Sequence, residues 1–205
     1  AAQQNTAGPG RRTYFFAPTN PISTYLFSFV AGKFSVYQQQ EMRMLFRENN
    51  PAKLKQSLDS IIIIHQNAID YLEAYTAYPF PFSKLDMACI PGFQYGGMEH
   101  VGAIQYREST LFLDKNATPS QSLRRAKLIA HETAHMWFGD LVTMKWFDDV
   151  WMKEVFANFM ADKIVNPQYP HINHDLNFFL LHYPLAYSED RTLGNTPIQQ
   201  DLQNL

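Results

Sequence analysis

Two histidines four residues apart, with a glutamate directly after the first, form the pattern in this sequence best suited to chemistry. His131, Glu132 and His135 lie in the stretch AHETAHMWFGD. On a helix this spacing places both imidazoles on one face, where they can bind the same metal ion. The pattern HExxH also arises by chance, so a metal site requires a third ligand from elsewhere in the chain.

Glu154, in the stretch WMKEVFANF, is the candidate third ligand. Zinc in a hydrolase takes three protein ligands and leaves a fourth position for water. A second helix that folds across the first would bring the Glu154 carboxylate beside His131 and His135. A carboxylate flanked by Trp151 and Phe156 is costly to bury unless it binds something. The sequence therefore predicts one zinc ion held by His131, His135 and Glu154.

Glu132 is the candidate catalytic base. A rotation of about 100° per residue along a helix directs its side chain away from the face that the two histidines share. It is therefore poorly placed to ligate the same ion, but it can hold the metal-bound water and take its proton. Zinc lowers the pKa of bound water to about 7, and Glu132 would pass the proton on to a leaving amine.

Two predicted helices would carry these residues. Residues 118–139 open with Thr118, a helix-capping residue type, and end at Gly139, a residue type that often stops helices. Residues 146–165 form the second predicted helix, with Glu154 near its start. Aromatic residues around the two helices are expected to pack between them as core; they are Trp137, Phe138, Trp146, Phe147, Trp151 and Phe156.

Strands are predicted mainly in the first half of the chain. Residues 11–39 are rich in aromatic and β-branched residues and predict two or three strands. Three shorter segments, residues 85–90, 100–107 and 109–114, are strand-like as well. One helix, predicted over residues 49–78, interrupts them, and the remaining helices follow. The order of elements indicates an α+β fold rather than alternating strands and helices.

Composition excludes several classes of protein. The chain has 205 residues, of which 46% are hydrophobic and 18% charged, an ordinary globular balance. A formal net charge of −2 is too near neutral to suggest a nucleic acid or an anionic membrane as partner. The longest apolar run, Ile61 to Ile64, is far too short to cross a bilayer, so no membrane span is predicted in this chain. Extracytoplasmic and cytosolic locations both fit.

These motifs together resemble the gluzincin aminopeptidases, the group of aminopeptidase N and leukotriene hydrolase. PISTYLFSFVAGKF is similar to the end of that family's N-terminal β-domain, and YGGMEHVGAIQYRE to its exopeptidase loop and substrate-edge strand. HETAHMWFGDLVTMKWFDDVWMKEVFANF is similar to its zinc-binding helices. The resemblance is strong over residues 13–165.

The resemblance implies a thermolysin-like zincin catalytic domain. Such a domain has a mixed sheet with an edge strand for substrate, followed by zinc-bearing helices, and strands from the end of an N-terminal β-domain precede it. Residues 1–40 would then be a flexible lead-in and the terminal strands of the β-domain. Residues 41–205 would be the metallopeptidase catalytic domain, truncated at its C-terminal end.

The exopeptidase loop reads GAMEN in the family and is Gly96, Gly97, Met98, Glu99 and His100 here. Glycine replaces alanine and histidine replaces asparagine, but the glutamate is kept. The resemblance implies that Glu99 binds the free α-ammonium of a peptide and that the preceding three residues line the substrate. A carboxylate held near the metal would pair with that amine and set the register, so that only the first peptide bond reaches the metal.

The resemblance therefore implies a zinc-dependent aminopeptidase that removes N-terminal residues from peptides by attack of metal-activated water. Further domains of the same polypeptide are expected as partners. The family's oxyanion-stabilising tyrosine would lie beyond Leu205, so we expect the isolated chain to hold zinc but to hydrolyse peptides poorly or not at all.

Two other functions remain open. A thermolysin-like endopeptidase would share the metal site, but an amine-binding Glu99 would block internal cleavage. A non-catalytic peptide-binding module on a peptidase fold is disfavoured by the intact set of His131, Glu132, His135 and Glu154. Zinc content, compared with that of a Glu154→Ala variant, tests all of these hypotheses.

Overall fold

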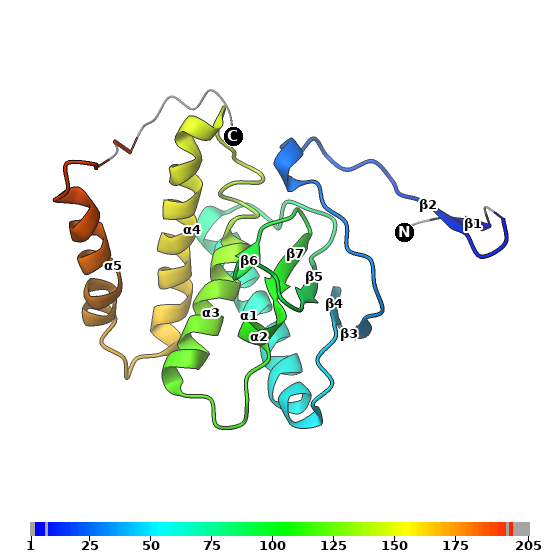
Figure 1. The fold of residues 1–205 in the computed structure, drawn as a ribbon, viewed down its shortest axis with the longest axis horizontal. Coiled ribbons are helices and arrows are strands. Elements are labelled where there is room, and N and C mark those ends of the chain that lie inside the picture. Colours follow the sequence, from blue (N-terminus) through cyan, green and yellow to red (C-terminus); the bar gives the residue numbers. More distant parts are fainter. Residues whose placement is uncertain (1–2, 7, 196, 199–205) are drawn as a thin grey trace.

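A five-stranded mixed sheet forms the centre of the computed structural model, which describes residues 3–6, 8–195 and 197–198 (Figure 1). The strand order is β3–β4–β5–β7–β6. The strands are β3 Ser35–Gln39, β4 Met42–Phe46, β5 Asp86–Ile90, β6 Gly97–Met98 and β7 Ala103–Arg107. The inner pairs are parallel, whereas β3 with β4 and β6 with β7 are antiparallel. The fold class is therefore α+β with a mixed sheet, as predicted.

Five α-helices accompany the sheet in the described residues, namely α1 Pro51–Thr76, α2 Glu108–Leu111, α3 Pro119–Ala134, α4 Val150–Val165 and α5 His174–Asp190. Helix α1 begins where the Asn50 side chain accepts from the backbone amides of Ala52 and Lys53, with Pro51 in the first turn. It connects the parallel strands β4 and β5, which makes this part of the chain a βαβ unit. One core cluster joins the sheet to α1, α3 and α4.

The strand predicted at residues 109–114 is wrong, because this segment begins in the short helix α2. Leu111 and Phe112 are buried there without any strand pairing. A short apolar run has the same appearance in a strand and in a buried helical turn. The strand predicted at residues 100–107 forms from Ala103 as β7, but it lies inside the sheet between β5 and β6. The edge of the sheet on this side is therefore β6, which the glycine-rich loop itself supplies.

The N-terminal segment contributes two further strands. Strand β1, Gln3–Thr6, pairs antiparallel with β2, Arg12–Phe15, in a separate two-stranded sheet. Part of the predicted lead-in therefore forms a strand. Figure 1 shows this hairpin projecting away from the rest of the fold. The boundary predicted after residue 40 falls in the turn between β3 and β4, which pair with each other.

The helices of the second half expose a large apolar surface. Trp137 is buried, as predicted, but Trp146, Trp151 and Phe156 are 51%, 37% and 45% exposed and do not form the predicted core. Helix α5 has no buried residue, and Figure 1 shows it beyond α4, away from the sheet. Its large exposed side chains are Leu176, Phe178, Phe179, Leu180, Leu181, Tyr183, Leu185 and Tyr187. None of the described helices combines the length and apolar character needed to cross a bilayer.

Candidate metal and substrate site

Helix α3 carries His131 and Glu132 in its last turn and ends one residue before His135. Its first turn is held by a capping box, in which Thr118 Oγ1 accepts from the Gln121 amide and the Gln121 side chain accepts from the Thr118 amide. The helix is shorter than predicted, because the chain leaves it at Ala134 and turns back at Gly139, where φ is 143°. Only glycine adopts that conformation readily.

Three side-chain atoms converge where α3 and α4 cross. His131 Nε2 lies 3.0 Å from His135 Nε2. Glu154 Oε2 lies 3.3 Å from His131 Nε2 and 3.6 Å from His135 Nε2. A tetrahedral zinc ion with bonds of about 2.0–2.2 Å holds its ligand atoms about 3.3 Å apart. The triangle therefore has the dimensions of a tetrahedral zinc site.

The proton positions also suit a metal. His135 Nδ1 lies 3.0 Å from the Phe138 carbonyl oxygen. Because a carbonyl only accepts, Nδ1 donates this hydrogen bond, and in the neutral imidazole Nε2 is left with a free lone pair. In the metal-free chain, burial would raise the pKa of Glu154, but hydrogen bonds from His131 and His135, whose Nε2 atoms then carry the protons, outweigh burial and hold that pKa well below its usual range. The carboxylate is thus ionised, as a ligand must be.

Glu154 is less buried than its apolar neighbours suggested. Its side chain is 45% exposed, and Trp151 and Phe156 face solvent too. Contrary to the prediction, Glu154 is therefore not a buried carboxylate in need of a partner, although it does lie beside the two histidines. A second group, Glu99, Glu132 and His135, also places its ligand atoms within 4.8 Å of one another. The described residues thus contain two overlapping groups that could hold a metal ion.

Glu132 lies between α3 and the edge strand β6. It is 4% exposed, and its side chain lies against Gly97, where a Cβ would approach Glu132 Cγ to 2.6 Å. The absence of a side chain at Gly97 therefore makes room for this carboxylate. Burial, followed by the negative charges of Glu99 and Glu154, raises the pKa of Glu132 well above its usual value. A raised pKa makes a carboxylate a stronger proton acceptor.

The loop residues form the edge of the sheet. Gly97 and Met98 pair with Tyr106 and Gln105 of β7. The Gly96 carbonyl accepts from the backbone amide of Arg107 at 2.9 Å. These contacts place the residues predicted to bind substrate in one line beside α3, with Glu99 directly after them.

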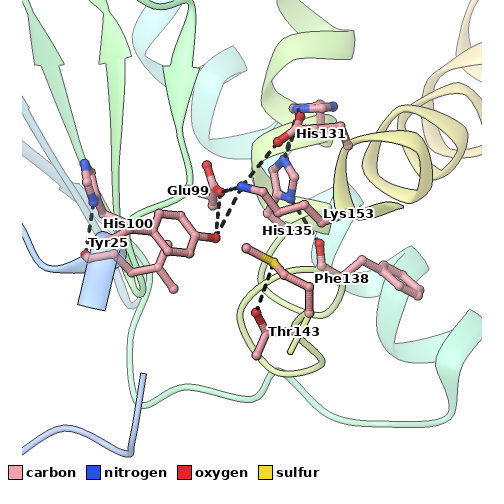
Figure 2. A network of polar contacts seen from close by, with 11 residues as sticks. Tyr25, Glu99, His100, His131, His135, Phe138, Thr143 and Lys153 are labelled. Carbon is pink, nitrogen blue, oxygen red and sulfur yellow. Dashed lines mark hydrogen bonds and ion pairs between the residues drawn. The ribbon is translucent and has the colours of Figure 1, made fainter. Parts of the chain in front are cut away.

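Glu99 is 3% exposed and is contacted from two distant parts of the chain (Figure 2). Tyr25, in the short helix Thr24–Leu26, donates its hydroxyl to Glu99 Oε1 at 3.1 Å. Lys153, on α4, pairs its ammonium with the same oxygen and also lies 3.2 Å from Glu154 Oε1. Burial would raise the pKa of Glu99, but nearby His135 and Lys153 lower it. The carboxylate predicted to bind a substrate amine already has an ammonium partner.

Sequence reasoning missed Tyr25, Lys153 and Asp140. Asp140 is buried, and neither of its carboxylate oxygens has a hydrogen-bond partner among the described residues. Burial, followed by the charge of Glu99, raises the pKa of Asp140 to about 9. Lys153 precedes a predicted ligand, which was a usable signal, but only the folded chain shows that it points at Glu99. Nothing in the sequence connects Tyr25 to this site.

The fold and this arrangement define the class of a metallohydrolase domain, with a histidine pair and a carboxylate on crossing helices and a buried acid at the sheet edge. Sequence comparison identifies the family. The profile described as the Peptidase family M1 domain matches residues 62–205, and the chain belongs to that family.

The curated relatives are consistent with this assignment. The chain is 36% identical over 192 residues to a "Probable aminopeptidase 1" of Sulfurisphaera tokodaii, covering 93% of this chain and 24% of the relative. It is 34% identical to the "Leucyl aminopeptidase" of Saccharolobus solfataricus, with 95% and 25% covered. A "Puromycin-sensitive aminopeptidase" of Caenorhabditis elegans is 33% identical, with 97% and 21% covered. The chain spans about a quarter of the length of these relatives.

Proposed function

We propose that this chain is the zinc-binding catalytic part of an aminopeptidase that removes N-terminal residues from peptides. The observation that carries the proposal is the triangle of His131, His135 and Glu154 atoms, at 3.0, 3.3 and 3.6 Å, with Glu132 beside it. Membership of the peptidase M1 family and the names of the relatives support the same activity.

His131, His135 and Glu154 would hold one zinc ion. When bound there, zinc supplies a Lewis acid and lowers the pKa of a coordinated water to about 7. Glu132 would accept the proton of the attacking water and return it to the leaving amine. The raised pKa of Glu132, which comes from its burial first, favours this exchange because the carboxylate holds a proton readily between the two steps.

Substrate would bind along the sheet edge. The outer side of β6 is the end of the strand order, so an extended peptide could add there as a further strand beside Gly96, Gly97 and Met98. Glu99 would face the free α-ammonium of the first substrate residue. No further substrate residue would then fit before it. An exopeptidase follows from this arrangement, because an internal peptide segment would have to displace the Glu99 contacts.

We also propose that residues 1–40 hold the end of an N-terminal β-domain and residues 41–205 the catalytic domain, with further domains of the same polypeptide around them. The separate β1–β2 sheet supports a distinct N-terminal unit. The relatives' greater length and the exposed apolar side chains of α4 and α5 support covering domains. The isolated chain is accordingly expected to turn over peptides weakly or not at all.

Zinc analysis of the purified chain tests the site. We expect about one zinc per chain by atomic emission after exhaustive dialysis, and loss of most of it in Glu154→Ala. The matched control is Asp162→Ala, which removes another carboxylate of α4, one that pairs with Lys127 at 2.6 Å. Wild-type protein without zinc, or equal zinc in Glu154→Ala and wild type, would overturn the assignment.

A further inference from the structure

We propose that Lys153 is a specificity-determining residue whose ammonium occupies the Glu99 carboxylate from within the chain and competes there with the α-ammonium of a ligand. The proposal rests on the proposed function, because that function assigns Glu99 to a substrate amine. It goes further by naming the group that opposes this amine. The expected result is a site whose preference for a free over a blocked N-terminus is weaker than it would be without this ammonium.

The position of Lys153 supports this role. Its side chain is 8% exposed and that of Glu99 is 4% exposed, so the pair is almost completely removed from water. Figure 2 shows the Lys153 ammonium between Glu99 and the two histidines. Tyr25 Oη lies 3.2 Å from the Lys153 ammonium and 3.1 Å from Glu99 Oε1, so the three side chains form a closed group. Lys153 is thus held at the site rather than extended into solvent.

The charges explain the competition. Both side-chain contacts of Glu99, from Tyr25 and Lys153, end on Oε1. A second ammonium brought to the same carboxylate would meet the positive charge of Lys153 in a place with little water to screen it. Like charges placed side by side in a desolvated site are a repulsive element that selects against a partner. A neutral N-acyl group carries no such penalty.

Lys153 also serves the unliganded protein. Lys153 contacts two carboxylates of the site directly, those of Glu99 and Glu154. Without this ammonium the buried Glu99 would lose the cation that contacts it directly, which is strongly unfavourable. Stability of the free site and discrimination against an amine ligand are therefore two results of one ion pair.

A double-mutant cycle tests the pair without any metal. Urea unfolding midpoints are measured in the presence of a chelator for wild type, Glu99→Gln, Lys153→Met and the double variant. We expect both single variants to unfold at lower urea concentration and the double variant to regain much of the loss, since it leaves no unpaired buried charge. Losses that simply add would overturn the proposal.

A pair of matched ligands tests the competition. Leucine hydroxamate and N-acetyl-leucine hydroxamate share a metal-binding group and differ in the charge of the amine. Their Kd values are measured by calorimetry on zinc-loaded wild type and Lys153→Met. We expect the preference for the free amine to rise by roughly tenfold or more in Lys153→Met. The control Lys127→Met removes a lysine of α3 that pairs with Asp162, and it should leave the ratio unchanged.

The two proposals fail in different ways. An unchanged ligand ratio in Lys153→Met, with zinc and hydroxamate still bound, would overturn the role of Lys153 and leave the proposed function standing. A shift of the same size in Lys127→Met would overturn it too, because the effect would then follow net charge. Absence of both zinc and hydroxamate binding in wild type would overturn the proposed function and the specificity role with it.

Discussion

His65 provides a prediction whose size can be worked out from the structure. It lies in the middle of α1, fully buried, with Nδ1 2.8 Å from the Ile61 carbonyl oxygen and Nε2 3.0 Å from the Tyr106 hydroxyl. The carbonyl only accepts, so Nδ1 carries the proton and Nε2 accepts from Tyr106. Both contacts are satisfied by the neutral ring, and protonation would create a buried charge.

Burial lowers the pKa of His65 from 6.5 to about 4. Between these values the unfolded chain binds more protons than the folded one, so stability is greatest above pH 6.5 and falls as the pH drops toward 4. Each unit of difference between the two pKa values is worth about 1.4 kcal/mol, so the full pH range between them corresponds to roughly 3 kcal/mol in the free energy of unfolding. About 2 kcal/mol of this should be lost between pH 7.5 and pH 5.

Urea unfolding at pH 7.5 and pH 5, with a chelator to remove effects of metal binding, measures this loss. Tyr106→Phe keeps His65 and should keep its pH dependence. The double variant His65→Leu/Tyr106→Phe removes both polar partners. Between pH 7.5 and pH 5 its free energy of unfolding should fall by about 2 kcal/mol less than that of Tyr106→Phe. An equal pH dependence in these two variants would refute the assignment of the titration to His65.

Three further predictions concern the site and the helix that carries it. Glu132→Gln should keep its zinc and raise the urea midpoint of the zinc-free protein, because burial opposes the charge of this carboxylate; a lower midpoint would contradict this. Gly97→Ala should lower the free energy of unfolding by about 1–3 kcal/mol, since the new Cβ would meet Glu132 Cγ at 2.6 Å. An unchanged free energy in urea unfolding would show instead that Glu132 moves freely. Thr118→Ala should cost about 1 kcal/mol through loss of the capping box while zinc content stays constant, with the exposed Ser120→Ala as control.

The sequence by itself determined the features that arise from contacts between residues close together in the chain, namely helix faces and helix starts. The four-residue spacing of His131 and His135 placed both on one helix face, because a helix repeats every 3.6 residues. Asn50 starts α1 and Thr118 starts α3 through contacts that are local in sequence, since capping side chains bond to amides a few residues away. The family could be recognised because its motifs are continuous in sequence.

Tertiary structure decided whatever depends on contacts between distant segments. The Glu99–Lys153 pair joins residues 54 positions apart, and the Tyr25–Glu99 hydrogen bond joins residues 74 apart. The same is true of β6, whose place at the sheet edge depends on its pairing with β7. The sequence by itself indicated a metal and a carboxylate for an amine. Only the folded chain shows that this carboxylate already has an ammonium partner, because side-chain charges on separate elements meet only when the elements pack.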